Sequence, residues 1–273
     1  MDFLTGKVVV IALFILLIHC IETLAYSTRI SGARVGFIAS ALSLFNLMVI
    51  VSRMANMVQQ PFTGSLLDVA PLDNRLDFVE SQFRVIIGAA SVGTILGILL
   101  LPTFVAVFSR AILHLRMEKG SVIGLFWKRL KLSYIRRMIL LFRSVSPGDI
   151  RSIDFRDIPK SLFFTNMVVT AVYTIGVLSA LYAALLAPDR ASTAIMASGL
   201  VNGIATILLV LFVDPKISLT ADEVGKTPGS YMRLRNMTAM MVLARFSGTL
   251  LAQILFIPGA YYVAWLTKYI FLF

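Results

Sequence analysis

Two ionisable side chains lie close together inside a long apolar stretch near the start of the sequence. His19 and Glu22 are three positions apart, a spacing that places them on one face of a helix. A charged side chain in hydrocarbon costs about 2.5–3.5 kcal/mol on insertion scales, so each one needs a partner or a function. His19 is interpreted either as a proton relay or as a polar group satisfied inside the structure.

A second polar set follows at helical spacing and adds a cation to the first. Its members are separated by seven, three and four positions, and they are Asn46, Arg53, Asn56 and Gln60. Arg53 has no obvious acidic partner in the apolar stretches, and Arg245 lies in a later one. Guanidinium groups bind phosphate oxygens in a bidentate way, so these residues predict a cationic cavity for a phosphorylated substrate. The alternative is that Glu22 pairs with Arg245 and only locks the helices together.

The elements that must position these residues are apolar helices long enough to cross a membrane. The 273-residue chain is 58% hydrophobic and 14% charged, whereas a soluble domain carries about 25% charged residues. Runs of this length fit helices that cross a hydrocarbon core, and they are too long for barrel strands. We therefore expect an all-α, polytopic membrane helix bundle. Its six predicted spans are Lys7–Tyr26, Val35–Val58, Val85–Phe108, Leu162–Ala187, Ala191–Val213 and Thr238–Trp265.

Charge is distributed unevenly between the connections. The segment 109–161 is strongly basic, whereas the connection after the second span is acidic. With the basic segment in the cytoplasm, 18 Lys and Arg residues lie inside, 5 lie outside and 2 lie within spans, and both termini are extracytoplasmic. Arg29 and Arg34 then belong to an inner loop. The formal charge of +11 predicts contact with anionic membrane lipids rather than with nucleic acid, and Leu125–Arg143 is predicted to be a cationic amphipathic helix on the inner leaflet.

The two halves of the chain resemble each other at an offset of about 155 residues. The pairs of matching positions are Tyr26 and Tyr182, Arg34 and Arg190, Asn46 and Asn202, Gly93 and Gly248, and Pro102 and Pro258. The similarity is either chance, because apolar sequences align easily, or an internal repeat. A repeat divides the chain into a three-helix unit 1–108, a connector 109–161 and a second three-helix unit 162–273. An odd number of spans inverts the second unit, and inverted repeats are typical of alternating-access transporters.

One stretch is distinctive enough to suggest a family. It begins His19-Cys20-Ile21-Glu22-Thr23-Leu24-Ala25-Tyr26-Ser27, continues through Arg29, Gly32, Arg34 and Ala39–Asn46, and ends Ser52-Arg53, Asn56-Met57 and Gln60-Pro61-Phe62-Thr63-Gly64. This pattern resembles the Amj family of bacterial lipid II flippases, an alternate to MurJ. The likeness is dense over residues 19–68 and looser elsewhere, and Met54-Ala55 departs from the small polar pair expected after the arginine.

The resemblance implies a function in cell wall biogenesis, and hence in cell shape. It implies that the chain moves lipid II, the undecaprenyl-pyrophosphate-linked disaccharide pentapeptide, from the inner to the outer leaflet of the bacterial cell membrane for peptidoglycan biosynthesis. We expect no catalytic residue, cofactor or metal. The predicted substrate-binding residues are Arg53, Arg245, Glu22, His19, Asn56, Asn46 and Arg34.

Three other functions stay open at this point. A proton-coupled small-solute transporter would use His19 and Glu22 as its proton site. A membrane-embedded enzyme acting on polyprenyl phosphates would need acidic metal ligands, for which Asp68, Asp73 and Asp77 are the candidates. A membrane scaffold would use only the basic segment, to recruit partners. The sequence contains no H-E-x-x-H, Walker lysine loop or G-x-S-x-G motif, so a metalloprotease, an ATPase and a serine hydrolase are poorly supported.

Overall fold

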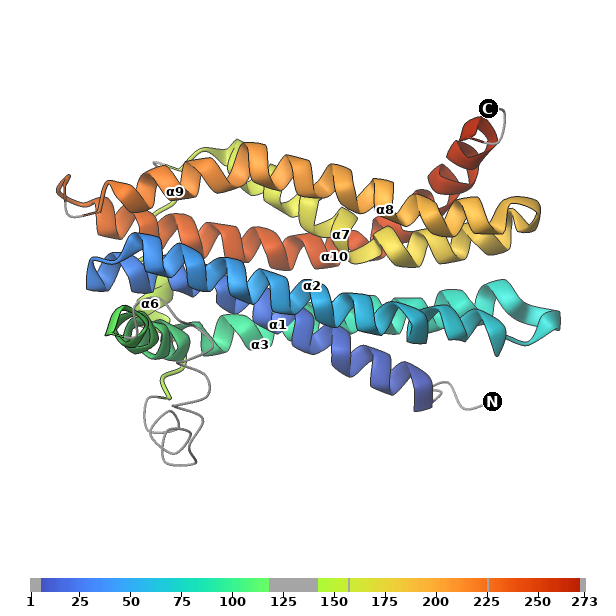
Figure 1. Ribbon diagram of the computed structural model, residues 1–273, viewed down its shortest axis with the longest axis horizontal. Helices are drawn as coiled ribbons and strands as arrows, with labels where there is room; N and C mark the ends of the chain where they lie inside the picture. Colours follow the sequence, from blue (N-terminus) through green and yellow to red (C-terminus); the bar gives the residue numbers. More distant parts are fainter. Residues whose placement is uncertain (1–5, 118–141, 157, 225, 271–273) are drawn as a thin grey trace.

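A computed structural model describes residues 6–117, 142–156, 158–224 and 226–270, and every regular element in these ranges is helical (Figure 1). The long helices are α1 (Gly6–Val35), α2 (Ile38–Asp68), α3 (Arg75–Met117), α7 (Lys160–Leu186), α8 (Ala191–Leu208) and α10 (Ser230–Ile270). Short elements are η1 (Leu72–Asn74), α6 (Pro147–Arg151), η2 (Pro188–Arg190), a π-helical turn at Leu209–Val213 and α9 (Asp214–Asp222). Six helical segments within the described ranges are long and apolar enough to cross a membrane, which confirms the six predicted spans.

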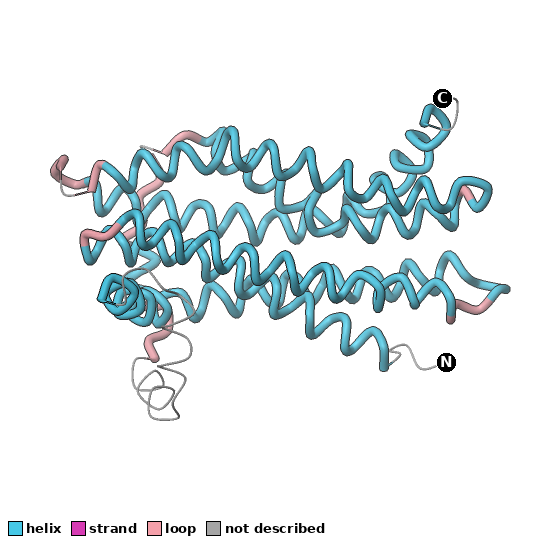
Figure 2. Tube along the Cα trace, viewed as in Figure 1, coloured by secondary structure: helices cyan, strands magenta, loops and turns pink. Residues whose placement is uncertain are grey.

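The helices run back and forth between two ends of the bundle (Figures 1 and 2). One end, which we call the basic end, carries the α1–α2 connection, α6 and the α9–α10 connection. The opposite end carries η1, η2, the start of α1 and the end of α10 (Figure 1). Some of the charged residues follow the predicted division: Arg34, Arg151 and Lys216 belong to elements at the basic end, and Asp68 and Asp73 belong to elements at the other.

Helix pairing follows the same pattern in both halves. In the first half α1 packs against α2 and α3, and in the second half α7 packs against α8 and α10. Glycines allow close approach in equivalent pairs. A Cβ on Gly93 of α3 would collide with the backbone of Leu16 in α1, and one on Gly248 of α10 would lie 2.6 Å from the carbonyl oxygen of Met167 in α7. Gly93 and Gly248, which match at the offset of about 155 residues between the two halves, therefore both allow two helices to pack closely.

Apolar packing and a reciprocal polar contact between α3 and α10 help to join the two halves. Near the opposite end, Phe256 of α10 packs edge-on against Phe83 and Tyr182, in a core that both halves build. Van der Waals contact of this kind, rather than escape from water, stabilises helix pairs in lipid. Between α3 and α10, Arg84 Nη1 donates to the carbonyl of Gln253 at 3.1 Å, and Gln253 Nε2 donates to the carbonyl of Arg84 at 2.9 Å. Each of these side chains thus bonds the backbone of the other helix.

Two predictions about the basic end have different outcomes. The prediction that Arg29 lies in an inner loop is wrong, because α1 continues as a helix to Val35 and the Arg29 side chain is only 4% exposed. Asp214, 185 residues away in the sequence, supplies the ion-pair partner that makes this burial possible. The predicted amphipathic helix Leu125–Arg143 lies outside the described residues, except for Phe142 and Arg143.

Candidate functional site

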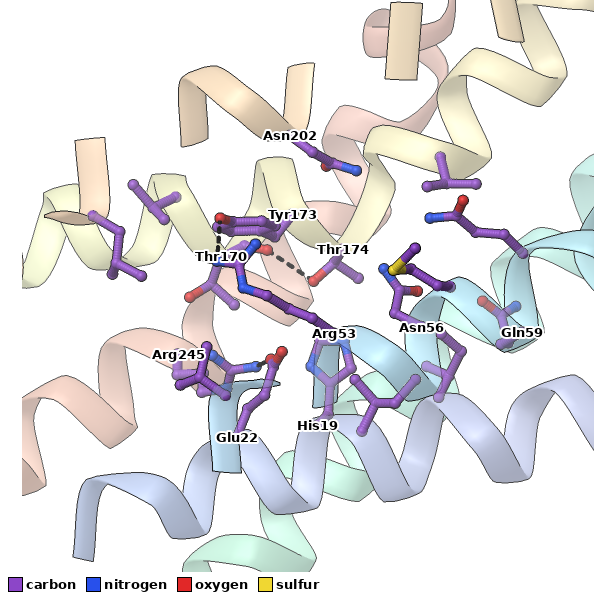
Figure 3. A pocket seen from close by; sticks show the side chains of 18 of the residues that line it. His19, Glu22, Arg53, Asn56, Gln59, Thr170, Tyr173, Thr174, Asn202 and Arg245 are labelled. Carbon is purple, nitrogen blue, oxygen red and sulfur yellow. Dashed lines mark hydrogen bonds and ion pairs between the residues drawn. The ribbon is translucent and has the colours of Figure 1, made fainter. Parts of the chain in front are cut away.

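A cavity of about 310 Å³ lies between the two halves (Figure 3). The first half contributes α1 and α2 to its wall, and the second half contributes α7, α8 and α10. Five of the seven predicted site residues line it, and these are His19, Glu22, Arg53, Asn56 and Arg245. Asn46 and Arg34 do not line the cavity: Asn46 is exposed on α2, and Arg34 is exposed in the last turn of α1.

Glu22 of α1 forms polar contacts with α2 and α10 at the cavity wall. Its Oε1 accepts a hydrogen bond from Ser52 Oγ of α2 at 2.6 Å, and its Oε2 pairs with Arg245 Nη2 of α10 (Figure 3). The Arg245 side chain is 11% exposed, and its Nε is buried without a partner among the described residues. The predicted Glu22–Arg245 pair is therefore formed, and it links the two halves.

Arg53 is the cation that the cavity leaves available. Its side chain extends from α2 toward Tyr173 of α7 (Figure 3), where its Nη2 donates to the Tyr173 hydroxyl at 3.1 Å. That hydroxyl also bonds Thr206 of α8. Among the described residues, no carboxylate lies within ion-pairing distance of Arg53. Arg53 is exposed, so an anion can reach its guanidinium without first displacing a buried charge.

His19 lines the same cavity but takes no part in the ion pair. The side chain is 6% exposed, and its Nδ1 is buried without a hydrogen-bond partner in the described part of the chain. Its backbone carbonyl accepts a hydrogen bond from Thr23 Oγ1 at 2.7 Å. The described residues therefore leave the hydrogen-bonding capacity of this ring nitrogen unused.

Polar residues of α7 complete the wall and were missed by the sequence analysis. Tyr26 donates to Asn166 Oδ1 at 3.3 Å, and Asn166 Nδ2 donates to the Met241 carbonyl at 2.9 Å, so this chain of bonds crosses α1, α7 and α10. Asn166, Thr170 and Tyr173 follow one another at spacings of four and three. That helical spacing is the signal that could have identified them.

The acidic residues proposed for an enzyme form no such site. Asp68, Asp73 and Asp77 lie at the opposite end of the bundle, away from the cavity. Within the described residues, no three His, Cys, Asp or Glu side chains come together as a group that could hold a metal ion.

Comparison with known proteins decides the family. The family model described as Amj, alternate to MurJ, matches residues 14–267. The chain belongs to the Amj family. It is similar to the lipid II flippase Amj of Bacillus subtilis (strain 168), with 59% identity over 269 residues that cover 98% of this chain and 100% of that protein. No solved structure matches the chain significantly.

Family membership confirms the resemblance read from residues 19–68 and extends it to nearly the whole chain. With its six apolar helices, this Amj chain is a multi-pass membrane protein. Its relative is named as a flippase, which is a transporter and not a catalyst of a chemical reaction.

Proposed function

We propose that this protein is a lipid II flippase that moves the undecaprenyl-pyrophosphate-linked peptidoglycan precursor from the inner to the outer leaflet. The observation that carries the proposal is Arg53, an accessible guanidinium in a polar cavity between the two halves, with no carboxylate partner among the described residues. A pyrophosphate supplies the oxygens that such a group binds most strongly. The relationship to a protein named lipid II flippase supports the same substrate.

The shape of the cavity suits a lipid whose two parts need different surroundings. Arg53 and Met57 line the cavity and are exposed on α2, so the cavity reaches the surface of the bundle beside this helix. The polyprenyl tail would stay in the bilayer there, while the pyrophosphate enters the polar interior. A volume of about 310 Å³ is at the lower end for a drug-sized ligand. A disaccharide pentapeptide is larger, so the halves must separate further to pass it.

Alternating access between inverted three-helix units, 1–108 and 162–273, would provide that separation. In support, α1 and α7 run in opposite directions between the ends of the bundle (Figure 1). Each packs against two helices of its own half, and Gly93 and Gly248 make equivalent close contacts. The positive-inside rule assigns the basic end, with the connector 109–161, to the cytoplasm and both termini to the outside. Basic side chains at that end would contact anionic lipids.

The direct test is headgroup translocation in proteoliposomes that contain only this protein and fluorescent lipid II. Arg53→Gln keeps a polar side chain and removes the charge, and we expect translocation at least about tenfold slower, because one charge-assisted contact is lost. Arg110→Gln, an exposed arginine of α3 at the basic end, is the matched control and should translocate normally. If Arg53→Gln translocates lipid II at the full rate, Arg53 does not make the proposed contact with the phosphates.

A proton-coupled small-solute carrier is the second candidate. The partnerless Nδ1 of His19 beside the Glu22–Arg245 pair favours it, because such a nitrogen can take up a proton inside the membrane. This candidate predicts proton-driven solute uptake by liposomes that lack any lipid-linked substrate. It also predicts that His19→Gln abolishes this uptake. Translocation of lipid II without proton flux would exclude it.

A further inference from the structure

A further arginine lies on the cavity-facing side of α1, nearer the basic end. Arg29 follows Glu22 by seven residues and Tyr26 by three, so it shares their helix face about 10 Å beyond Glu22. Its Cζ lies 4.3 Å from the centre of the ring of Phe45, a residue that lines the cavity. The side chain is 4% exposed. Arg29 is thus buried against Phe45 of the cavity wall, on the helix face that carries Glu22 and Tyr26, although it does not itself line the cavity.

The partner of Arg29 uses only part of the guanidinium. Nη2 donates to Oδ1 of Asp214 in α9 at 2.7 Å, whereas Nε and Nη1 are buried without a partner among the described residues. A guanidinium presents five N–H donors in a planar fork that matches phosphate and carboxylate oxygens in pairs. Asp214 therefore leaves N–H donors of the Arg29 guanidinium without an acceptor, and an anion with more oxygens would accept hydrogen bonds from more of them.

Asp214 lies where the regular α-helical hydrogen bonding is interrupted. It directly follows the π-helical turn Leu209–Val213, and Pro215 comes next. π-Helical turns frequently mark functional sites, and proline lacks the backbone N–H that continues a helix. Leu209, at the start of the same turn, lines the cavity. Movement of this wall can therefore withdraw Asp214 from Arg29.

We propose that Arg29 is a second phosphate-binding residue of the transport path, and that Asp214 occupies it as an internal anion when no headgroup is present. The proposal rests on the proposed function, because it takes the phosphate-bearing headgroup as its ligand. A headgroup that arrives from the basic end contacts Arg29 first and displaces Asp214. It then passes along the same face of α1 to Arg53. When Asp214 pairs with Arg29 again, the basic end closes behind the headgroup.

Binding of a short-chain polyprenyl pyrophosphate to the full-length protein in nanodiscs tests the proposal. Asp214→Asn removes the competing anion, so we expect about tenfold tighter binding. Asp222→Asn, an exposed residue of the same helix, should leave binding unchanged. Adding Arg29→Gln to Asp214→Asn should abolish the gain. Unchanged or weaker binding in Asp214→Asn, or a gain that persists without Arg29, would overturn the proposal.

Two further ligands show which part of the polyprenyl pyrophosphate causes the change in binding. Polyprenol, which lacks the phosphates, should bind equally to all variants. Inorganic pyrophosphate should show the Asp214→Asn gain if Arg29 recognises the phosphates themselves, and absence of that gain would count against the assignment. Arg53→Gln is the reference for the proposed function. If Arg53→Gln weakens binding while the Arg29 and Asp214 variants do not, only the Arg29 assignment is lost; if Arg53→Gln also has no effect, the proposed function fails.

A paired substitution keeps the test valid if Asp214→Asn does not fold. Arg29→Met combined with Asp214→Leu removes the buried arginine and its partly exposed partner together, and apolar replacement of a buried ion pair is often neutral for stability. We expect a thermal unfolding temperature close to that of the unaltered protein, with weaker pyrophosphate binding and slower headgroup translocation. Normal binding and translocation in this variant would show that the pair is structural only and would overturn the proposal.

Discussion

Replacing Glu22 by Gln removes one charge from the bridge across the cavity and leaves its partner in place. Arg245 is 11% exposed and its Nε already lacks a partner in the described residues, so the single change leaves a buried cation with poor compensation. Breaking a fully buried pair on one side costs about 3–5 kcal/mol. Because Glu22 is 30% exposed, water can reach the site, and we expect a cost of about 2–3 kcal/mol.

The assay is thermal unfolding in detergent, followed by the fluorescence of a thiol dye that reacts with the buried Cys20 as the bundle opens. A cost of this size corresponds to a decrease of about 5–10 °C in the unfolding temperature. The double variant Glu22→Gln with Arg245→Gln removes both charges and should recover at least half of this decrease. An unfolding temperature for Glu22→Gln equal to that of the unaltered protein would refute the reasoning, because the pair would then not lock the helices.

The same two variants decide between the interpretations of the pair. If Glu22 and Arg245 only join the halves, the stable double variant should translocate lipid II normally. If Arg245 also contacts the substrate, the double variant should be stable yet slow.

Two further predictions concern packing and positioning. Gly93→Ala places a Cβ against the backbone of Leu16 and should destabilise the protein by about 1–3 kcal/mol, whereas Gly64→Ala in α2, with nothing within 4 Å, should be neutral or slightly stabilising in thermal unfolding. Tyr173→Phe removes the hydroxyl that holds Arg53 but keeps the ring, and it should weaken pyrophosphate binding about three- to tenfold without lowering the unfolding temperature. Thr206→Val, which loses the hydroxyl bonded to Tyr173, should have the same effect on binding, and normal binding in both variants would contradict the positioning role.

Local sequence rules predicted the parts of the site that depend on one helix at a time. Six apolar runs predicted six spans, and helical spacing placed His19 with Glu22 and Arg53 with Asn56 on the cavity wall. These rules work because the period of a helix is fixed and charges in lipid are costly. The pairing of Glu22 with Arg245 could be proposed because few opposite charges lie inside the spans.

Features that depend on contacts between distant segments could not be predicted in the same way. Arg29 marked the end of a span by local hydropathy, yet it is buried, because Asp214 of the other half neutralises it. Asn46 shares a helix face with Arg53 by spacing, but Phe45 takes the cavity-facing position at that level of α2. The helical spacing of Asn166, Thr170 and Tyr173 could have placed Tyr173 on a polar face of α7, but its contact with Arg53 could not be predicted, because that contact depends on where α2 lies.

The reciprocal bonds between Arg84 and Gln253 limit how the two halves can move. Because each side chain grips the backbone of the opposite helix, sliding of α3 along α10 would stretch both bonds at once. Tilting of one helix against the other about this level leaves both lengths nearly unchanged. The crossing of α3 and α10 thus has the geometry of a fulcrum, and widening of the bundle on one side of it entails narrowing on the other.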